Sequence, residues 1–151
     1  MEPRIIVVED DHEDANWISE ALRTSLRVSV EVVRCERDFV VRLPEFGKDK
    51  PDLLVFDVML YWATSSEELE REVEEGKVPK DVLEEGFMRA GLRCVSRLTA
   101  REDTKDIPYL IYTGLQTNNF SQEVIHIRDI ITKSDDIKPL LTAVKNKLAR
   151  R

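Results

Sequence analysis

The stretch RIIVVEDD, residues 4–11, decides the fold. Four apolar side chains from Ile5 to Val8 predict a short buried β-strand, and three carboxylates follow it at once. Glu9, Asp10 and Asp11 repel one another. Burying such charges without a partner costs more free energy than the packing of the nearby apolar side chains contributes. A strand that ends in this way needs something to balance the negative charge, and the rest of the sequence indicates what that is.

Composition narrows the class of protein. The chain has 151 residues, enough for a single domain (residues 1–151) with its own core, and 42% of them are hydrophobic. The net charge of −7 argues against direct nucleic-acid binding, which needs a basic surface. We find no apolar run long enough to cross a membrane and no signal-peptide pattern, so we expect a cytoplasmic location without a membrane partner. Cys35 and Cys94 are expected to be small buried side chains in a reducing compartment.

Short β-branched runs alternate with amphipathic stretches along the chain. Trp17, Ile18, Ala21, Leu22 and Leu26 fall on one face of a predicted helix. A second, shorter helix around residues 39–43 is expected to close at Pro44 and Gly47. Further strands are predicted at 28–34, 51–57, 107–113 and 128–133, and a last helix begins near residue 135.

Strands that are separated by helix-length connections pair in parallel, because a parallel neighbour needs a long crossover. Right-handed crossovers then place helices on both faces of the sheet. The sequence therefore predicts an α/β fold with a doubly wound, five-stranded parallel sheet. Ligands bind such sheets beyond the carboxyl ends of the strands.

Five polar residues stand at those carboxyl ends. Glu9 and Asp10 follow the first predicted strand, Asp57 ends the third, Thr113 ends the fourth and Lys133 follows the fifth. Converging carboxylates are tolerable when Mg²⁺ shares them, because this ion takes one or two carboxylates together with water and phosphate oxygens. Lys133 and Thr113 supply a charge and a hydroxyl for phosphate oxygens. A carboxylate can also act as the nucleophile and form an aspartyl phosphate.

Four stretches of the sequence carry a resemblance to a known family: IIVVEDD (5–11), PDLLVFDVML (51–60), IPYLIYTG (107–114) and ITKS (131–134). In this order they resemble the receiver domain of two-component response regulators, the CheY-like family. The segment at 90–98, AGLRCVSRL, is similar to the start of the family's third helix.

The resemblance implies a flavodoxin-like sheet with strand order 2-1-3-4-5. It also implies that Asp57 accepts a phosphoryl group from a histidine kinase or a phosphotransfer protein. Mg²⁺ would be held by Glu9, Asp10, Asp57 and the backbone carbonyl of Met59. Thr113 and Lys133 would bind the phosphoryl group. The position at which many receivers carry a switching aromatic residue is Ile130 here, so the common form of signal coupling is not expected.

Residues 61–86 depart from the family as an acidic insertion between the third strand and the third helix. Residues 64–85 carry nine acidic and three basic residues. The spacing of Leu69 and Val73 predicts a short helix with Ser65 or Ser66 as its N-cap. Tyr61 and Trp62 are candidates to anchor it. Two interpretations stay open: a solvated excursion, or a surface that shields the site or selects a partner.

We expect a stand-alone phosphoacceptor without an output domain in this chain, with an unknown downstream protein target and possible dimerisation. It would not be an enzyme beyond self-catalysed phosphoryl transfer and autodephosphorylation. The autodephosphorylation is expected to be slow, because the apolar side chains of Met59 and Leu115 flank the path by which water would approach the phosphoryl group. One alternative is a receiver-like interaction module that is never phosphorylated. Another is a haloacid dehalogenase-type phosphatase, which needs a carboxylate two residues after its nucleophile. Met59 stands there and cannot transfer protons, which disfavours that alternative.

Overall fold

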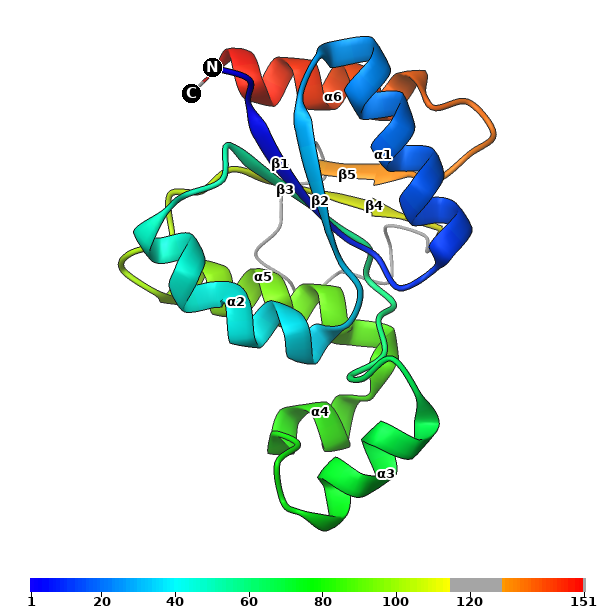
Figure 1. The fold of residues 1–151 in the computed structure, drawn as a ribbon, viewed down its shortest axis with the longest axis vertical. Helices are drawn as coiled ribbons and strands as arrows, with labels where there is room; N and C mark the ends of the chain where they lie inside the picture. Colours follow the sequence, from blue (N-terminus) through cyan, green and yellow to red (C-terminus); the bar gives the residue numbers. More distant parts are fainter. Residues whose placement is uncertain (115–128, 151) are drawn as a thin grey trace.

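A parallel sheet forms the centre of the molecule (Figure 1). The structure, a computed structural model, describes residues 1–114 and 129–150. All four strand pairings are parallel and the strand order is β2-β1-β3-β4-β5, which confirms the predicted fold and order. β1 (Arg4–Val8) is one residue longer than predicted. The other strands are shorter than predicted: β2 (Ser29–Val33), β3 (Leu53–Phe56), β4 (Tyr109–Thr113) and β5 (Ile130–Thr132).

Helices cover both faces of this sheet. Figure 1 shows α1 (His12–Leu26) and α6 (Lys138–Ala149) on one face, and α2 (Glu36–Lys48) and α5 (Ala90–Ala100) on the other. Because successive side chains of a strand point to opposite faces, Ile5 and Val7 pack in the core under α1 and α6. Ile6 and Val8 pack in the core under α2 and α5. In the part of the chain that the structure describes, every helix is too short or too polar to cross a lipid bilayer.

Helix α1 faces the sheet with a different stripe from the one predicted. It buries Ala15, Ile18, Ser19 and Leu22, whereas Trp17 is 41% exposed. Neighbouring helical residues are separated by about 100° around the axis, so a stripe centred on Ile18 turns Trp17 toward its edge. The prediction that Trp17 shares the apolar face of this helix with Ile18 and Leu22 was therefore wrong.

Helix α2 continues through Pro44 and Gly47 to Lys48, so the predicted closure was wrong. Pro44 removes one helical N–H donor, but its side chain is exposed. Buried side chains of α2 stand on both sides of it, and their packing offsets the lost hydrogen bond: Phe39, Leu43 and Phe46. A Cβ on Gly47 would lie 2.2 Å from the carboxylate of Asp103, an exposed side chain that would have to move to make room for it.

Between β3 and α5 the chain forms what we call the α3–α4 segment, residues 61–89. It contains α3 (Ser66–Glu74), α4 (Lys80–Glu85) and a short 3₁₀ helix (Phe87–Arg89). The predicted helix around Leu69 is present, and Ser65 caps it by accepting a hydrogen bond from the Glu68 N–H. Helix α4 was not predicted, since its six residues bury only Val82. In Figure 1 α3 and α4 extend beyond the layer of α2 and α5.

The α3–α4 segment is attached to the body at the start of α2. The carbonyls of Tyr61 and Trp62 accept hydrogen bonds of 2.9 Å from the Glu36 and Arg37 N–H groups. The first N–H groups of a helix have no acceptor within the helix, so these two hydrogen bonds satisfy donors of α2 that would otherwise be unpaired. The Trp62 side chain packs in a small apolar cluster that includes Val40 of α2, which confirms it as an anchor. The Tyr61 side chain is 55% exposed, so this residue anchors through its backbone instead.

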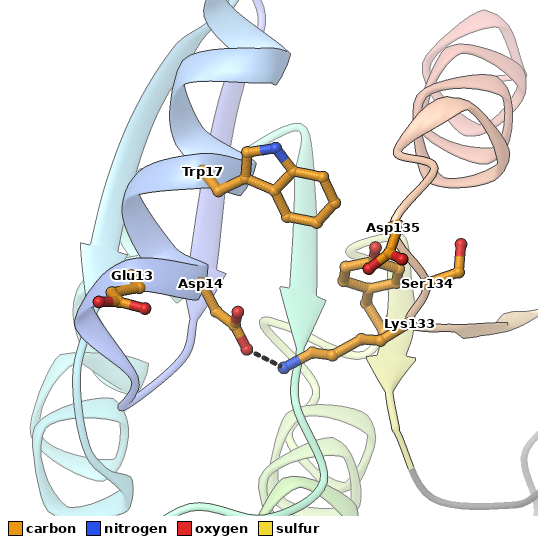
Figure 2. Close-up of a pocket in the computed structure, with 7 residues that line it drawn as sticks. Glu13, Asp14, Trp17, Lys133, Ser134 and Asp135 are labelled. Atoms are coloured by element: carbon orange, nitrogen blue, oxygen red, sulfur yellow. Dashed lines mark hydrogen bonds and ion pairs between the residues drawn. The ribbon is translucent and has the colours of Figure 1, made fainter.

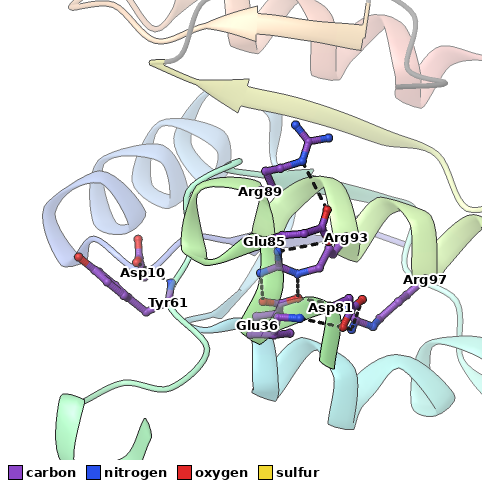
Figure 3. Close-up of polar contacts among 9 residues, drawn as sticks. Asp10, Glu36, Tyr61, Asp81, Glu85, Arg89, Arg93 and Arg97 are labelled. Carbon is purple, nitrogen blue, oxygen red and sulfur yellow. Dashed lines mark hydrogen bonds and ion pairs between the residues drawn. The ribbon is translucent and has the colours of Figure 1, made fainter. Parts of the chain in front are cut away.

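A buried ionic network joins α2, α4 and α5 (Figure 3). Glu36 is fully buried and accepts two hydrogen bonds from Arg93, at 2.8 and 2.9 Å, and one from Arg97 at 2.8 Å. Arg97 also contacts Asp81 of α4 at 3.1 Å, and Arg93 lies 3.7 Å from Glu85. Each guanidinium is therefore balanced by carboxylates from other elements.

Candidate functional site

Three carboxylates meet at the carboxyl edge of the sheet. β1 and β3 are neighbours in register, with Val8 opposite Phe56, so Glu9 and Asp57 leave adjacent strands side by side. One oxygen from each of Glu9, Asp10 and Asp57 lies within 4.8 Å of the others. Glu9 is only 1% exposed and Asp57 is also buried. We call these three residues the acid cluster.

Lys133 reaches the acid cluster from the end of β5. Its Nζ donates hydrogen bonds to Glu9, to Asp57 Oδ2 at 3.3 Å and to Asp14 Oδ2 at 3.0 Å. The sequence analysis missed Asp14. The signal was available, because Asp14 follows Asp10 by four residues in the first turn of α1, on the same edge of the sheet.

The other predicted site residues occupy different places. Thr113 is buried at the end of β4, on the strand next to Asp57. Met59 is half-buried two residues after Asp57. Ile130 is 9% exposed and packs in the core under α2 and α5. Leu115 and most of the connection between Thr113 and Lys133 lie outside the described residues.

Backbone contacts shape the loop after β3. The Val58 N–H donates to Asp57 Oδ1 at 2.7 Å, and the Val58 carbonyl accepts from the Gly91 N–H at 2.8 Å. A Cβ on Gly91 would lie 2.0 Å from the Asp57 carbonyl oxygen, so only glycine permits this approach of α5. The Tyr61 N–H donates to Asp10 Oδ2 at 3.3 Å, which connects the α3–α4 segment to the acid cluster.

The pKa values of two carboxyl groups in the acid cluster are raised, so the negative charge of the cluster is not fully compensated. Burial and the neighbouring Asp57 raise the pKa of Glu9 to about 8. Burial also raises the pKa of Asp10. Burial alone would lower the pKa of Lys133, but the charges of Asp57 and Glu9 outweigh it and raise that pKa. The cluster therefore lacks positive charge, and its oxygen donors fit a hard divalent cation such as Mg²⁺.

Stability of the metal-free protein is expected to fall as pH rises from about 4.5 to about 8, the ordinary and the folded pKa of Glu9. In that window the folded state keeps a proton that the unfolded chain has released. Lys133 adds no slope there, because its contribution is lost only above its ordinary pKa of 10.5. Urea unfolding at several pH values measures this, with a fall of at least about 1.4 kcal/mol, the equivalent of one pKa unit. Glu9→Gln should flatten the profile, and an unchanged slope would contradict the assignment.

Comparison with known proteins supports the fold. No protein-family model matches the sequence, and no curated protein matches it either. Among solved structures, the chain is similar to a signal receiver domain of a signal transduction histidine kinase from Syntrophus aciditrophicus. That match has 24% identity and a TM-score of 0.68, and it covers 98% of this chain and 91% of the other.

Two further solved structures show the same likeness. One is the chemotaxis response regulator CheY4 of Vibrio cholerae, with 16% identity, a TM-score of 0.67 and coverage of 97% and 99% of the two chains. The other is the phosphorylated cyanobacterial phytochrome response regulator RcpA, with 22% identity, a TM-score of 0.64 and coverage of 97% and 91%. Most of the similar structures are response regulator receiver domains, so the predicted resemblance is confirmed at the level of fold. The chain has the CheY-like receiver fold.

Proposed function

We propose that this chain is a response regulator receiver that accepts a phosphoryl group at Asp57 in a Mg²⁺-dependent reaction. The observation that carries the proposal is the meeting of Glu9, Asp10, Asp57 and Lys133 at one sheet edge, in a receiver fold. We propose a histidine kinase or a phosphotransfer protein as the donor, and the cytoplasm as the place of the reaction. The downstream protein target and dimerisation remain predictions.

In this proposal a carboxylate oxygen of Asp57 attacks the phosphorus of a phosphohistidine. The new O–P bond replaces the N–P bond, and the imidazole that leaves takes up a proton. Mg²⁺ bound by Glu9, Asp10, Asp57 and the Met59 carbonyl would neutralise charge on the phosphoryl oxygens. Asp57 is held for the reaction by the Val58 N–H, which leaves its second oxygen facing Lys133.

Lys133 and Thr113 would hold the transferred group. Lys133 already lies among the acid cluster, so a phosphoryl group on Asp57 would compete with Glu9 and Asp14 for its three N–H donors. The Thr113 hydroxyl would donate to another phosphoryl oxygen. Ile130 is aliphatic and packed in the core, so we propose that the signal leaves the site without an aromatic switch at this position.

The test is incubation with acetyl phosphate and Mg²⁺, followed by intact-mass measurement of an acid-stable, alkali-labile adduct. We expect the adduct in the wild type and its complete loss in Asp57→Asn or when EDTA removes the metal. Asp11→Asn is the matched control, because asparagine still caps α1 and Asp11 lies outside the acid cluster.

Two outcomes would overturn the proposal. An adduct that persists in Asp57→Asn, or that ignores Mg²⁺, would exclude the assigned acceptor or the metal site. A folded wild type that never forms the adduct would favour the alternative of an interaction module that is not phosphorylated.

A further inference from the structure

A cavity of about 560 Å³ opens beside the acid cluster, between the first half of α1 and the connection from β5 to α6. Figure 2 shows Trp17 and Asp14 on α1 facing Lys133 and Asp135 across this space. Its size is within the range of small-molecule sites. The proposed phosphoryl transfer uses Lys133 from this lining but assigns no role to Trp17, Glu13 or Asp135.

The charged groups that line the cavity are mostly carboxylates. Lys133, the one cation among the described lining residues, already donates to three carboxylates. The Ser134 hydroxyl donates to the Asp136 carbonyl at 3.0 Å. Among the described residues, the lining carries Glu13, Asp14 and Asp135 against Lys133, two more negative charges than positive ones. Figure 2 shows Asp135 across the space from Trp17, whereas the Glu13 carboxylate points away from it.

Aromatic surface completes the cavity. Trp17 is 41% exposed despite its size, and it forms no contact with another ring among the described residues. Tyr112 is buried and lines the same space. Lys133 Nζ lies 6.0 Å from the centre of the Tyr112 ring, which shows that a cation is already accommodated here. Aromatic faces attract cations, and more so where water is excluded.

We propose that this cavity binds an organic cation rich in N–H donors, a guanidinium or alkylammonium group, between Trp17 and the carboxylate of Asp135. The group would belong either to a free small molecule or to a basic side chain of a protein partner. Bound there, it would also compete with Lys133 for Asp14. Binding does not depend on phosphorylation of Asp57, so this inference stands apart from the proposed function.

Matched probes test the chemistry and its source. Isothermal titration with butylguanidinium should show saturable binding that weakens with salt, whereas butylurea, its neutral analogue of the same shape, should bind at least about tenfold more weakly. A second pair is a short peptide with one arginine and the same peptide with citrulline. Saturation by the arginine peptide alone would identify a partner's side chain as the source. Binding by neither cationic probe, or equal binding by the neutral ones, would overturn the proposal.

Variants locate the binding in this cavity. Trp17→Ala should weaken binding of the cationic probe about fivefold or more, and Asp135→Asn should act in the same direction. Glu70→Gln removes the same charge from the exposed face of α3, outside the cavity, and should leave affinity unchanged. Asp57→Asn should still bind the probe. Thermal unfolding confirms that each variant is folded, and a folded Trp17→Ala that binds like the wild type would refute the assignment.

Discussion

Replacement of Glu36 by leucine is expected to lower the free energy of unfolding by about 3–5 kcal/mol, because it leaves the buried guanidinium of Arg93 without its carboxylate. Arg93 is buried, and both of its hydrogen bonds go to Glu36. Two further acids act on Arg93 from α4: Glu85, at 3.7 Å, and more weakly Asp81. The loss should be large for one side chain, since a charge that cannot be hydrated has no alternative partner of equal quality. Urea unfolding followed by circular dichroism measures it.

A double variant separates this mechanism from a simple loss of packing. Replacing both partners, Glu36→Leu with Arg93→Leu, removes the isolated charge and should recover a large part of the stability lost in Glu36→Leu alone. Arg97 retains Asp81 in both variants. If the double variant is less stable than the single one, the network stabilises by packing rather than by charge compensation.

The second large effect is expected at Gly91. An alanine Cβ would lie 2.0 Å from the Asp57 carbonyl oxygen and 2.7 Å from Val58 Cα, and both of these are backbone atoms that cannot rotate away. Overpacking of this kind costs about 1–3 kcal/mol or more. Because the displaced loop carries Asp57, Gly91→Ala should also slow formation of the acetyl phosphate adduct. Unfolding and adduct kinetics on the same sample measure the two effects.

Gly114→Ala is the matched control. A Cβ at Gly114 meets no atom of the described residues within 4 Å, and its backbone has no positive φ. This variant should change stability by no more than about 0.5 kcal/mol. If Gly91→Ala were equally harmless, the close approach of α5 to the Asp57 loop would not constrain the site.

The sequence was most informative where one physical rule acts alone. β1 and β3 are short apolar runs, and parallel topology brings their carboxyl ends to one edge, so Glu9 and Asp57 could be placed together without coordinates. Lys133 followed by the same logic. The carboxylates were the most informative residues for predicting this site, because several negative charges at the end of a buried strand are unfavourable unless a positive partner is present.

What the sequence could not reveal depended on tertiary choices. The stripe of α1 that faces the sheet was misjudged for Trp17, since apolar spacing alone allows more than one rotation of a helix. Helix α4 has a single buried side chain, so it gives no periodic signal. Glu36 and Arg93 are 57 residues apart, and each alone reads as a surface charge. Their pairing is visible only after α2 and α5 pack together.

Tyr61 joins two parts of the protein through one residue: its N–H contacts Asp10, and its carbonyl receives the Glu36 N–H. The length and placement of the chain that follows it are thus tied both to an oxygen of Asp10 in the acid cluster and to the first turn of α2. Under the proposed Mg²⁺ site, trimming or exchanging residues 62–86 would disturb metal affinity even if no proposed ligand were changed. If residues 62–86 were transferred to another receiver fold, Tyr61 would have to be included to keep both contacts, the one to Asp10 and the one to the start of α2.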